Sequence, residues 1–406
     1  MASARALSNE TAIVAVGTKV VERDDPLITS LQIQLYACQD AMRTAGIDRT
    51  QIGALFTGRP PMGYTALQWN MRLINELKIV PRFSSEVTIH GAGVLGTLHY
   101  AALAVQTGTV DYAICCSGCT GQRWTDLKVI SNSLDSDLQF EAPYGTFTPV
   151  LNALWAQRYM HEFEVTPEDM ALVAVENRRW ALEHPHAAMR DKGPLTVDDV
   201  VNSRPIALPL RLLDCSAWYR GGFGTALVVT RSELVRPEDR PVYLSGIGQC
   251  VTHEWVTERL ELTGIEPSVE PNLLTTGAKV AADAAYEGAG WGPADVDLVE
   301  TSSPFTYANM MMLEDFGFCE KGEGAQFVRD GGIDFEDGLP FNTNGGYLSF
   351  GQAANGMHTA VEAIQQLRGE AEGKPVASAE RALVHFHGGA QSAHTVALLC
   401  NEEGLL

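Results

Sequence analysis

Two histidines near the carboxyl end of the chain have the residue type and spacing needed for proton transfer. His385 and His387 occur in the segment HFHGG, where the apolar run ALV meets a pair of glycines. The apolar run predicts a buried strand, and residues two apart on a strand point to the same side. A neutral imidazole can accept or donate a proton near neutral pH. The segment therefore predicts an acid–base pair where a strand enters a glycine turn, and the alternative is a pair of hydrogen-bonded structural histidines.

Cysteine chemistry is less favoured by the sequence. The eight cysteines are spread through the chain, at Cys38, Cys115, Cys116, Cys119, Cys215, Cys250, Cys319 and Cys400. Without an export signal, this distribution predicts buried, reduced thiols. Cys116 and Cys119 form a C-x-x-C pair, but a zinc site needs a second pair of ligands at suitable spacing, and none follows nearby. We therefore expect no metal site.

The composition excludes several classes of protein. The 406 residues include 29 Lys+Arg and 50 Asp+Glu, which gives a net charge of −21. Binding of nucleic acid requires clustered cations, so we do not expect it. A content of 45% hydrophobic and 19% charged residues predicts a folded chain, with part of its surface buried in an oligomer. No stretch reaches the roughly 18 apolar residues of a membrane span, and the first residues lack the pattern of an export signal, so we expect a cytoplasmic protein.

The elements that position the two histidines belong to a pattern that occurs twice. Residues 45–57 (AGIDRTQIGALFT) and 289–301 (AGWGPADVDLVET) each read as a helix end, a polar turn and a strand. Residues 89–118 and 344–389 each read as a glycine turn, an apolar helix and a buried strand. We predict a duplicated α/β unit, with residues 1–235 and 240–406 as its halves and an insertion at about 120–210 in the first. The alternative is chance similarity between two ordinary α/β segments.

Five segments carry a resemblance to a known family. They are APYGTFTPVLNALWAQRYMHEF (142–163), RPIALPLRLLDC (204–215), LEDFGFCEKGEGAQFVRDGG (313–332), LPFNTNGGYLSFGQ (339–352) and HFHGG (385–389). Together they resemble the thiolase superfamily, in particular its lipid-transfer branch of sterol-carrier-protein-type thiolases and steroid side-chain-cleaving thiolase-like aldolases. The resemblance implies a duplicated thiolase fold of two similar halves, with mixed β-sheets sandwiching and covered by helices.

The resemblance also shows which catalytic groups of the family are missing. Thiolases hold a nucleophilic cysteine at a helix N-terminus, where the helix dipole favours a thiolate, and this position falls at about Gly91. The histidine of their G-H-P turn corresponds to Gln352, and their second cysteine corresponds to His385 or Phe386. A cysteine-based Claisen mechanism is therefore not expected. The related aldolases also lack the cysteine and rely on two tyrosines, whose positions correspond to Ser302 and Gln352.

Other residues near these positions could replace the missing groups. Tyr347 and Tyr307 each offer a phenol, and burial in the core is the alternative for both. Gln352 could donate a hydrogen bond to a thioester carbonyl, and Ser302 could bond a substrate hydroxyl, although both could equally be turn residues. The predicted catalytic residues are His385, His387, Tyr347, Gln352, Ser302 and Tyr307.

A second set of residues could bind the coenzyme A thioester that the resemblance implies. Coenzyme A carries phosphates and an adenine ring, which suit cations beside a stacking aromatic ring, as offered by Arg178 and Arg179 next to Trp180. A solvated helix face is the alternative for these arginines. Glycines at a helix entrance let a ligand approach the backbone closely. The predicted substrate-binding residues are His90, Gly91, Gly93, Gly345, Gly346, Arg178 and Arg179.

The function implied by the resemblance is that of a thiolase-fold lyase that cleaves the Cα–Cβ bond of a bulky β-hydroxyacyl-CoA by retro-aldol chemistry. Coenzyme A would be part of the substrate, and no tightly bound cofactor is expected. One alternative is a non-catalytic subunit that binds acyl-CoA or serves as a scaffold. Another is an acyltransferase that uses Cys116 or Cys119. The resemblance further implies a homodimer and a small partner protein with an OB-fold and a zinc ribbon.

Overall fold

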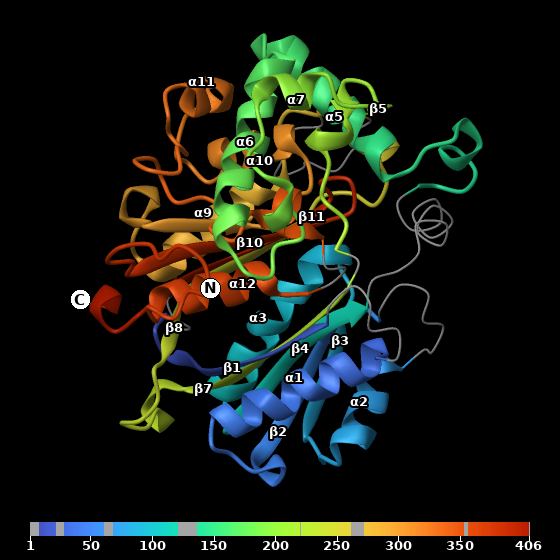
Figure 1. Cartoon of the computed structure of the whole chain (residues 1–406). Helices are drawn as coiled ribbons and strands as arrows, with labels where there is room; N and C mark the ends of the chain where they lie inside the picture. Colours follow the sequence, from blue (N-terminus) through green and yellow to red (C-terminus); the bar gives the residue numbers. More distant parts are fainter. Residues whose placement is uncertain are drawn as a thin grey trace.

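The structure of the chain, a computed structural model, describes residues 8–21, 28–60, 68–120, 136–219, 221–260, 272–352 and 356–405. A nine-stranded mixed sheet runs through the molecule in the order β3-β2-β4-β7-β1-β8-β11-β10-β9 (Figure 1). Its strands are β1 (Thr11–Val21), β2 (Ile52–Gly58), β3 (Phe83–Val87), β4 (Tyr112–Thr120), β7 (Gly222–Arg231), β8 (Val242–Val251), β9 (Leu298–Thr301), β10 (Arg381–Gly388) and β11 (Ala393–Cys400). A separate pair consists of β5 (Pro205–Ala207) and β6 (Leu210–Arg211).

The same sequence of strand pairings occurs twice in the sheet. β2 is parallel to β4, β4 is antiparallel to β7, and β7 is antiparallel to β1. In the same way, β9 is parallel to β10, β10 is antiparallel to β11, and β11 is antiparallel to β8. The two sets meet where Ala12 and Ile13 of β1 pair with β8. The α/β class is as expected, with the sheets of the two sets joined edge to edge. The predicted boundaries of the two halves, at residues 235 and 240, stay a prediction; they fall between β7 and β8.

Helices cover both faces of this sheet. Ile13 packs in a core cluster with residues of α3 (Gly93–Gln106) and α12 (His358–Leu367). Its neighbour Ala12 packs in another cluster, with residues of α1 (Ser30–Thr44) and α2 (Trp69–Leu77). Because successive strand residues point to opposite faces, α3 and α12 lie on one face of the sheet, and α1 lies on the other.

Equivalent glycines let a helix approach the first strand of each set. A Cβ atom at Gly17 in β1 would lie 2.1 Å from the carbonyl oxygen of Ala37 in α1. A Cβ atom at Gly248 in β8 would lie 2.0 Å from the carbonyl oxygen of Ala281 in α9 (Gly277–Ala289). Any side chain at these positions would push the helix off the sheet, so the sequence needs glycine at both.

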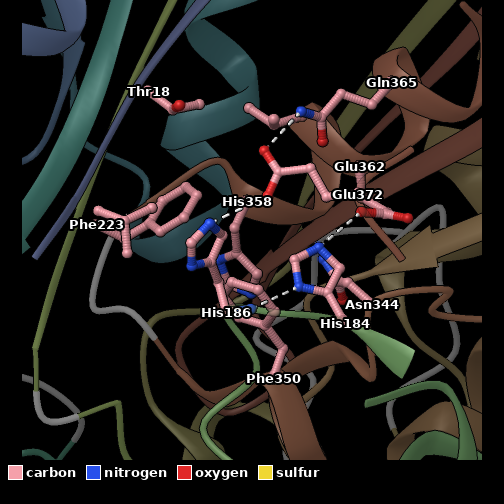
Figure 2. A pocket seen from close by; sticks show the side chains of 12 residues that line it. Thr18, His184, His186, Phe223, Asn344, Phe350, His358, Glu362, Gln365 and Glu372 are labelled. Atoms are coloured by element: carbon pink, nitrogen blue, oxygen red, sulfur yellow. Dashed lines mark hydrogen bonds and ion pairs between the residues drawn. The ribbon is translucent and has the colours of Figure 1, made fainter. Parts of the chain in front are cut away.

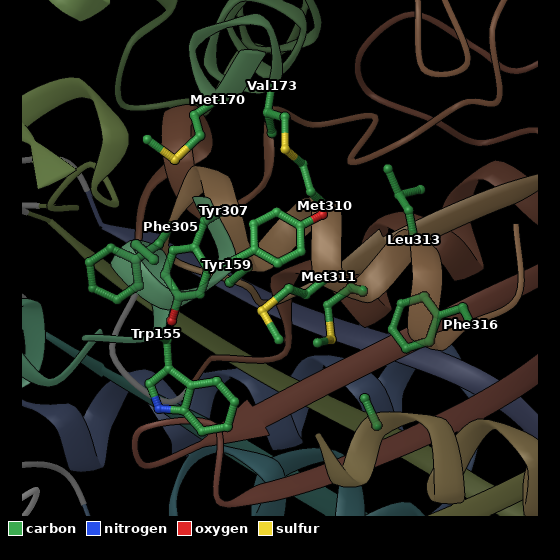
Figure 3. Packing of buried hydrophobic residues seen from close by; sticks show 14 of the residues in the cluster. Trp155, Tyr159, Met170, Val173, Phe305, Tyr307, Met310, Met311, Leu313 and Phe316 are labelled. Atoms are coloured by element: carbon green, nitrogen blue, oxygen red, sulfur yellow. The ribbon is translucent and has the colours of Figure 1, made fainter. Parts of the chain in front are cut away.

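The described part of the predicted insertion forms a helical layer, drawn in green in Figure 1, and residues 121–135 of it lie outside the described residues. It contains α5 (Thr148–Phe163), α6 (Pro167–Glu183) and α7 (Val197–Val201). α5 and α6 pack on α10 (Thr306–Asp315) through buried apolar side chains (Figure 3). Further helices are α8 (Val256–Leu260) and α11 (Gly324–Arg329). Across the described ranges, no helix has the length and apolar character needed to cross a membrane.

Candidate active site

The glycine turn before α3 packs against the end of β10. The hydroxyl of Thr395 donates a hydrogen bond to the carbonyl oxygen of Ala92 across 3.1 Å. A Cβ atom at Gly91 would lie 2.4 Å from the carbonyl oxygen of His387, and a Cβ atom at Gly388 would lie 2.4 Å from the Cβ atom of His90. Gly91, which corresponds to the nucleophile position of thiolases, therefore has no room for a side chain unless the HFHGG segment shifts.

His385 lies inside a continuous chain of buried hydrogen bonds. Its Nδ1 atom is 2.8 Å from the hydroxyl of Thr301, and its Nε2 atom is 3.0 Å from Nδ1 of His394. Nε2 of His394 lies 3.2 Å from the carbonyl oxygen of Gln391, which can only accept, so this nitrogen carries the proton. His394 then accepts from His385, and His385 accepts from Thr301, whose oxygen lies 3.0 Å from the hydroxyl of Ser303. Every donor in the chain thus has one acceptor.

This chain changes the role expected for His385. Both of its ring nitrogens are engaged, and its side chain is fully buried. Burial, reinforced by His394 and His387, lowers the pKa of His385 well below its usual range. Burial also lowers the pKa of His394 to about 3. His385 therefore stays neutral at pH 7 and has no free nitrogen with which to take a proton from a substrate.

His387 differs from His385 in accessibility and in its partners. The two rings lie on the same side of β10, as predicted, with centroids 6.4 Å apart. His387 is partly exposed, but its Nδ1 atom is buried and makes no hydrogen bond of normal geometry in the described part of the chain, although the backbone of Ser302 approaches the ring. Its backbone N–H donates to the hydroxyl of Ser302 across 3.0 Å. Burial lowers the pKa of His387 to about 4, so the imidazole is neutral at pH 7.

Tyr347 joins this group through Ser302. It belongs to a π-helix, Gly346–Gly351, and its phenol is hydrogen-bonded to the side chain of Ser302. Burial raises the pKa of this phenol well above its usual range, and the charge of Arg59 nearby opposes the rise. The hydroxyl of Ser302 thus lies between the phenol of Tyr347 and the backbone of His387. Three of the predicted catalytic residues are brought together here.

Tyr307 is held in the core beneath this group. Its ring packs among the apolar side chains of α5, α6 and α10 (Figure 3). Its hydroxyl donates to Oδ1 of Asn152 across 2.7 Å and lies 3.4 Å from Nε2 of Gln391. Burial raises its pKa well above the usual range. The alternative of a buried core tyrosine therefore describes Tyr307 well, although Gln391 links it to the histidine chain.

Gln352 ends the π-helix on the side of the loop that precedes β7. Its Oε1 atom accepts from the hydroxyl of Ser216 across 3.1 Å, and its backbone N–H donates to Ala217 across 2.7 Å. The next residues, 353–355, lie outside the described part of the chain. Gln352 is partly exposed, and these contacts orient its amide.

The remaining glycines predicted to bind substrate serve the packing of the backbone. A Cβ atom at Gly93 would lie 2.2 Å from a carbonyl oxygen of β3. Gly345 has a φ of +98°, and a Cβ atom there would lie 2.5 Å from the Cβ atom of Ala181 in α6. At Gly346 the clash would be with the side-chain amide of Asn342, at 2.6 Å. These glycines let α3 and α6 pack closely on their neighbours, and Gly345 and Gly346 lead directly into Tyr347.

The two arginines predicted to bind phosphate are engaged within the protein. Arg178 is only 5% exposed, and its Nε atom donates to the hydroxyl of Ser349 in the π-helix across 3.3 Å. Arg179 forms ion pairs with Glu176 at 3.0 Å and Asp334 at 2.9 Å. Neither the solvated helix face nor a cationic surface for coenzyme A describes this pair, because both guanidinium groups are used to join α6 to the loops around it.

Several residues of the site could not be found from the sequence. His394, Gln391 and Thr301 complete the chain around His385, and His253 lies beside them, with Nε2 3.3 Å from the carbonyl oxygen of Ala390. The register that places His387 opposite His394 depends on the hairpin between β10 and β11. The only sequence signal was the HFHGG segment followed by a histidine five residues beyond its second glycine.

The cysteines of the C-x-x-C pair are unsuited to act as nucleophiles. Cys116 and Cys119 are both buried, with at most 2% of their surface exposed. Burial raises the pKa of Cys116 well above its usual range and that of Cys119 to about 12. Nucleophilic cysteines need the thiolate at neutral pH, and this environment favours the thiol.

Comparisons with known proteins show similarity in sequence and in fold. A family model described as "Thiolase C-terminal domain-like" matches residues 263–401. The 17-hydroxy-3-oxo-4-pregnene-20-carboxyl-CoA lyase of Mycobacterium tuberculosis is 33% identical over 392 residues, which cover 93% of this chain and 96% of that protein. An acetyl-CoA acetyltransferase of Methanothermobacter thermautotrophicus is 31% identical, with 86% of this chain and 88% of that protein covered.

A solved structure described as "Ltp2-ChsH2(DUF35) aldolase" superposes with a TM-score of 0.81 at 27% identity, covering 98% of this chain and 100% of that chain. The sequence and the fold therefore agree over nearly the whole length of each relative. The chain belongs to the thiolase superfamily, in the branch that contains the steroid side-chain-cleaving aldolases and sterol-carrier-protein-type thiolases.

Proposed function

We propose that this chain is a lyase that cleaves the Cα–Cβ bond of a bulky β-hydroxyacyl-CoA thioester by a retro-aldol reaction. The name of the Mycobacterium tuberculosis relative specifies a 17-hydroxy, 20-carboxyl-CoA substrate, in which the hydroxyl lies β to the thioester carbonyl. The similar solved structure is described as an aldolase. Both relatives support carbon–carbon cleavage over acyl transfer.

The reaction needs a base, a stabilised enolate and an acid. The base removes the proton of the β-hydroxyl, and the oxygen forms a carbonyl group as the Cα–Cβ bond breaks. The electron pair of that bond passes into the enolate of the thioester, which hydrogen-bond donors stabilise. Protonation at Cα then gives a shorter acyl-CoA. No nucleophilic cysteine takes part, so a glycine at position 91 is compatible with the chemistry.

The observation that carries the proposal is the His387–Ser302–Tyr347 group. The buried Nδ1 atom of His387 makes no hydrogen bond of normal geometry within the described residues, and the low pKa of His387 keeps its imidazole neutral at pH 7, with one nitrogen free of a proton. We assign His387 as the base that takes the β-hydroxyl proton. Tyr347 and Ser302 supply hydroxyl groups in contact with each other, and we assign Tyr347 as the proton donor to Cα.

The other predicted residues take supporting roles in this proposal. His385 is a positioning residue, because its hydrogen bonds with Thr301 and His394 fix the end of β10 that carries His387. The enolate would be held by backbone N–H groups and by the amide of Gln352, whose oxygen is already engaged by Ser216. His90 and Gly91 would form the wall of the site on the side of α3, since both contact the HFHGG segment.

We further propose that the chain acts as a homodimer in the cytoplasm, with a small OB-fold, zinc-ribbon partner. The partner is supported by the second component in the description of the solved aldolase structure. Coenzyme A enters as part of the substrate, and no tightly bound cofactor is required by the retro-aldol step.

A second candidate function is supported by two positions. The tyrosines that the related aldolases are understood to use correspond to Ser302 and Gln352, and neither residue here carries a phenol. A non-catalytic subunit that binds acyl-CoA would tolerate both changes. The position of Tyr347, hydrogen-bonded to Ser302, supports the lyase instead, because it returns a phenol to one of these two places.

The test is to incubate the chain, with and without the zinc-ribbon partner, with a β-hydroxyacyl-CoA that carries a bulky steroid-like group. Mass spectrometry would detect the carbonyl product and the shortened acyl-CoA. The lyase predicts both products, and their loss in His387→Ala and Tyr347→Phe. Tight binding of the thioester without turnover under any of these conditions would establish the non-catalytic subunit.

A further inference from the structure

Four aromatic rings form a stack beside the candidate active site. The rings of Tyr347 and His358 have centroids 5.0 Å apart and planes inclined by 19°. His358 and Phe350 follow at 4.7 Å and 12°, and Phe350 and Tyr219 at 5.8 Å and 10°. All four side chains are at most 8% exposed. We call these four residues the aromatic column; its inner end is the phenol that bonds Ser302.

The column joins three segments that are distant in sequence. Tyr347 and Phe350 come from the π-helix, His358 begins α12, and Tyr219 ends the described part of the loop before β7. A π-helix is strained relative to an α-helix and is commonly found at functional sites. Here the π-helix places Tyr347 and Phe350, three positions apart, on either side of the imidazole of His358, so this ring is stacked between them.

The imidazole of His358 has no polar role within the described residues. It is 1% exposed, and neither ring nitrogen makes a hydrogen bond of normal geometry in the described part of the chain, although the backbone of Gly356 approaches it. Burial, followed by the charge of His184, lowers the pKa of His358 to about 3. The ring is therefore neutral over the physiological range, and what it supplies is a flat surface.

The outer side of His358 borders a small pocket (Figure 2). His184, His186 and Glu362 also line it, and its volume is about 20 Å³. That volume admits a water molecule and excludes an acyl chain. The Nε2 atoms of His184 and His186 lie 3.5 Å and 3.1 Å from carboxylates of Glu362 and Glu372. The pocket beside the column is thus too small for an acyl chain, and two histidine–carboxylate contacts line it.

We propose that His358 is a positioning residue for Tyr347, which holds the phenol against Ser302 by ring stacking alone. This inference rests on the proposed function, in which Tyr347 donates a proton to the enolate. A phenol that rotated away from Ser302 would no longer be positioned to donate its proton. A displacement of about 1 Å in a catalytic group can lower the rate about 100-fold. A flat ring at position 358 is sufficient for this role, and its nitrogens are not needed.

The test compares three substitutions at one position. His358→Phe keeps a flat ring, whereas His358→Ala and His358→Asn remove it; His186→Ala, at the same pocket but outside the column, is the matched control. We expect kcat to fall at least 10-fold in the Ala and Asn variants with KM nearly unchanged, and to stay within about threefold of wild type in the Phe and control variants. Equal losses in His358→Phe and His358→Ala would overturn the proposal, because the nitrogens would then matter.

A second readout does not depend on turnover. In protein labelled with 3-fluorotyrosine, the ¹⁹F resonance of Tyr347 can be identified by its loss in Tyr347→Phe. We expect that resonance to stay in place in His358→Phe and to shift and broaden in His358→Ala. An unmoved resonance in His358→Ala would refute the positioning role. If the wild-type chain cleaves no substrate, the proposed function fails, and this spectrum still decides whether His358 positions Tyr347.

Discussion

The Nε2 atom of His385 lies 3.0 Å from Nδ1 of His394, and the two imidazoles are nearly parallel, at 15°. Because the carbonyl oxygen of Gln391 fixes the proton of His394, the protonation of the whole chain is fixed as far as Ser303. The two histidines of HFHGG therefore differ in hydrogen bonding and in exposure. His385 is fully buried with both ring nitrogens engaged, whereas His387 is partly exposed.

This division predicts opposite consequences for the two histidines. His387→Ala should lower kcat by about 100- to 10,000-fold, the range expected for loss of a general base, with little change in melting temperature. His385→Ala should lower the melting temperature markedly, because it removes the acceptor of the Thr301 hydroxyl and the donor to Nδ1 of His394. Steady-state kinetics and thermal unfolding of both variants provide the check. Full activity in His387→Ala would remove it from the mechanism.

The contact with His394 can be tested through stability. His394→Ala should reduce the free energy of unfolding by about 1–3 kcal/mol from the unsatisfied Nε2 atom of His385 alone, with a further loss from the cavity. Urea denaturation measures this change. The exposed His161→Ala, in the last turn of α5, serves as the control and should unfold like wild type. A stability equal to wild type in His394→Ala would mean that the chain of hydrogen bonds contributes nothing.

Restoring a side chain at the thiolase nucleophile position should damage the protein. Gly91→Ala and Gly91→Cys each place a Cβ atom about 2.4 Å from the carbonyl oxygen of His387, so we expect a loss of about 1–3 kcal/mol in unfolding free energy and no thiolytic activity in the cysteine variant. Gly292→Ala is the matched control, because a Cβ atom there meets nothing within 4 Å. Thiolytic cleavage by Gly91→Cys at wild-type stability would contradict this expectation.

The buried histidines make stability depend on pH. The pKa of His358 is lowered from 6.5 to about 3 in the folded chain, so between these values the unfolded chain binds a proton that the folded chain does not. The free energy of unfolding is therefore not reduced by this proton above pH 6.5, and it decreases progressively as the pH falls toward 3. Unfolding measured at pH 7.5 and pH 5 should show a smaller loss in His358→Phe than in wild type. An identical pH dependence in the two proteins would show that His358 titrates normally.

Much of the fold could be predicted from the sequence, because its signals are local and occur twice. The Ala-Gly turn at residues 45–46 precedes β2 as the one at residues 289–290 precedes β9, and the apolar run after the HGAG turn forms α3. Glycines such as Gly17 and Gly248 mark where a helix touches a strand. The HFHGG segment was also expected at the end of a strand, and it lies at the end of β10.

The roles of individual site residues were less predictable, because they depend on contacts between distant segments. Sequence spacing could place His385 and His387 on one side of β10. Only the pairing of β10 with β11 brings His394 into hydrogen-bonding distance of His385. Arg178 and Arg179 looked like surface cations, and the packing of α6 on the π-helix engages both instead. No local pattern indicates that His358 would lie between Tyr347 and Phe350, since that stack forms only when α12 packs against the π-helix.

The measurement that tests the central claim most directly is the fate of a bulky β-hydroxyacyl-CoA in D₂O without added free coenzyme A. The lyase mechanism needs no second thiol, and its enolate is protonated by solvent-exchanged groups. The account therefore predicts one carbonyl product and one shortened acyl-CoA that carries a single deuterium at Cα. No cleavage of the β-hydroxyacyl-CoA, together with coenzyme A-dependent cleavage of a β-ketoacyl-CoA into two thioesters, would contradict the account and establish a thiolase.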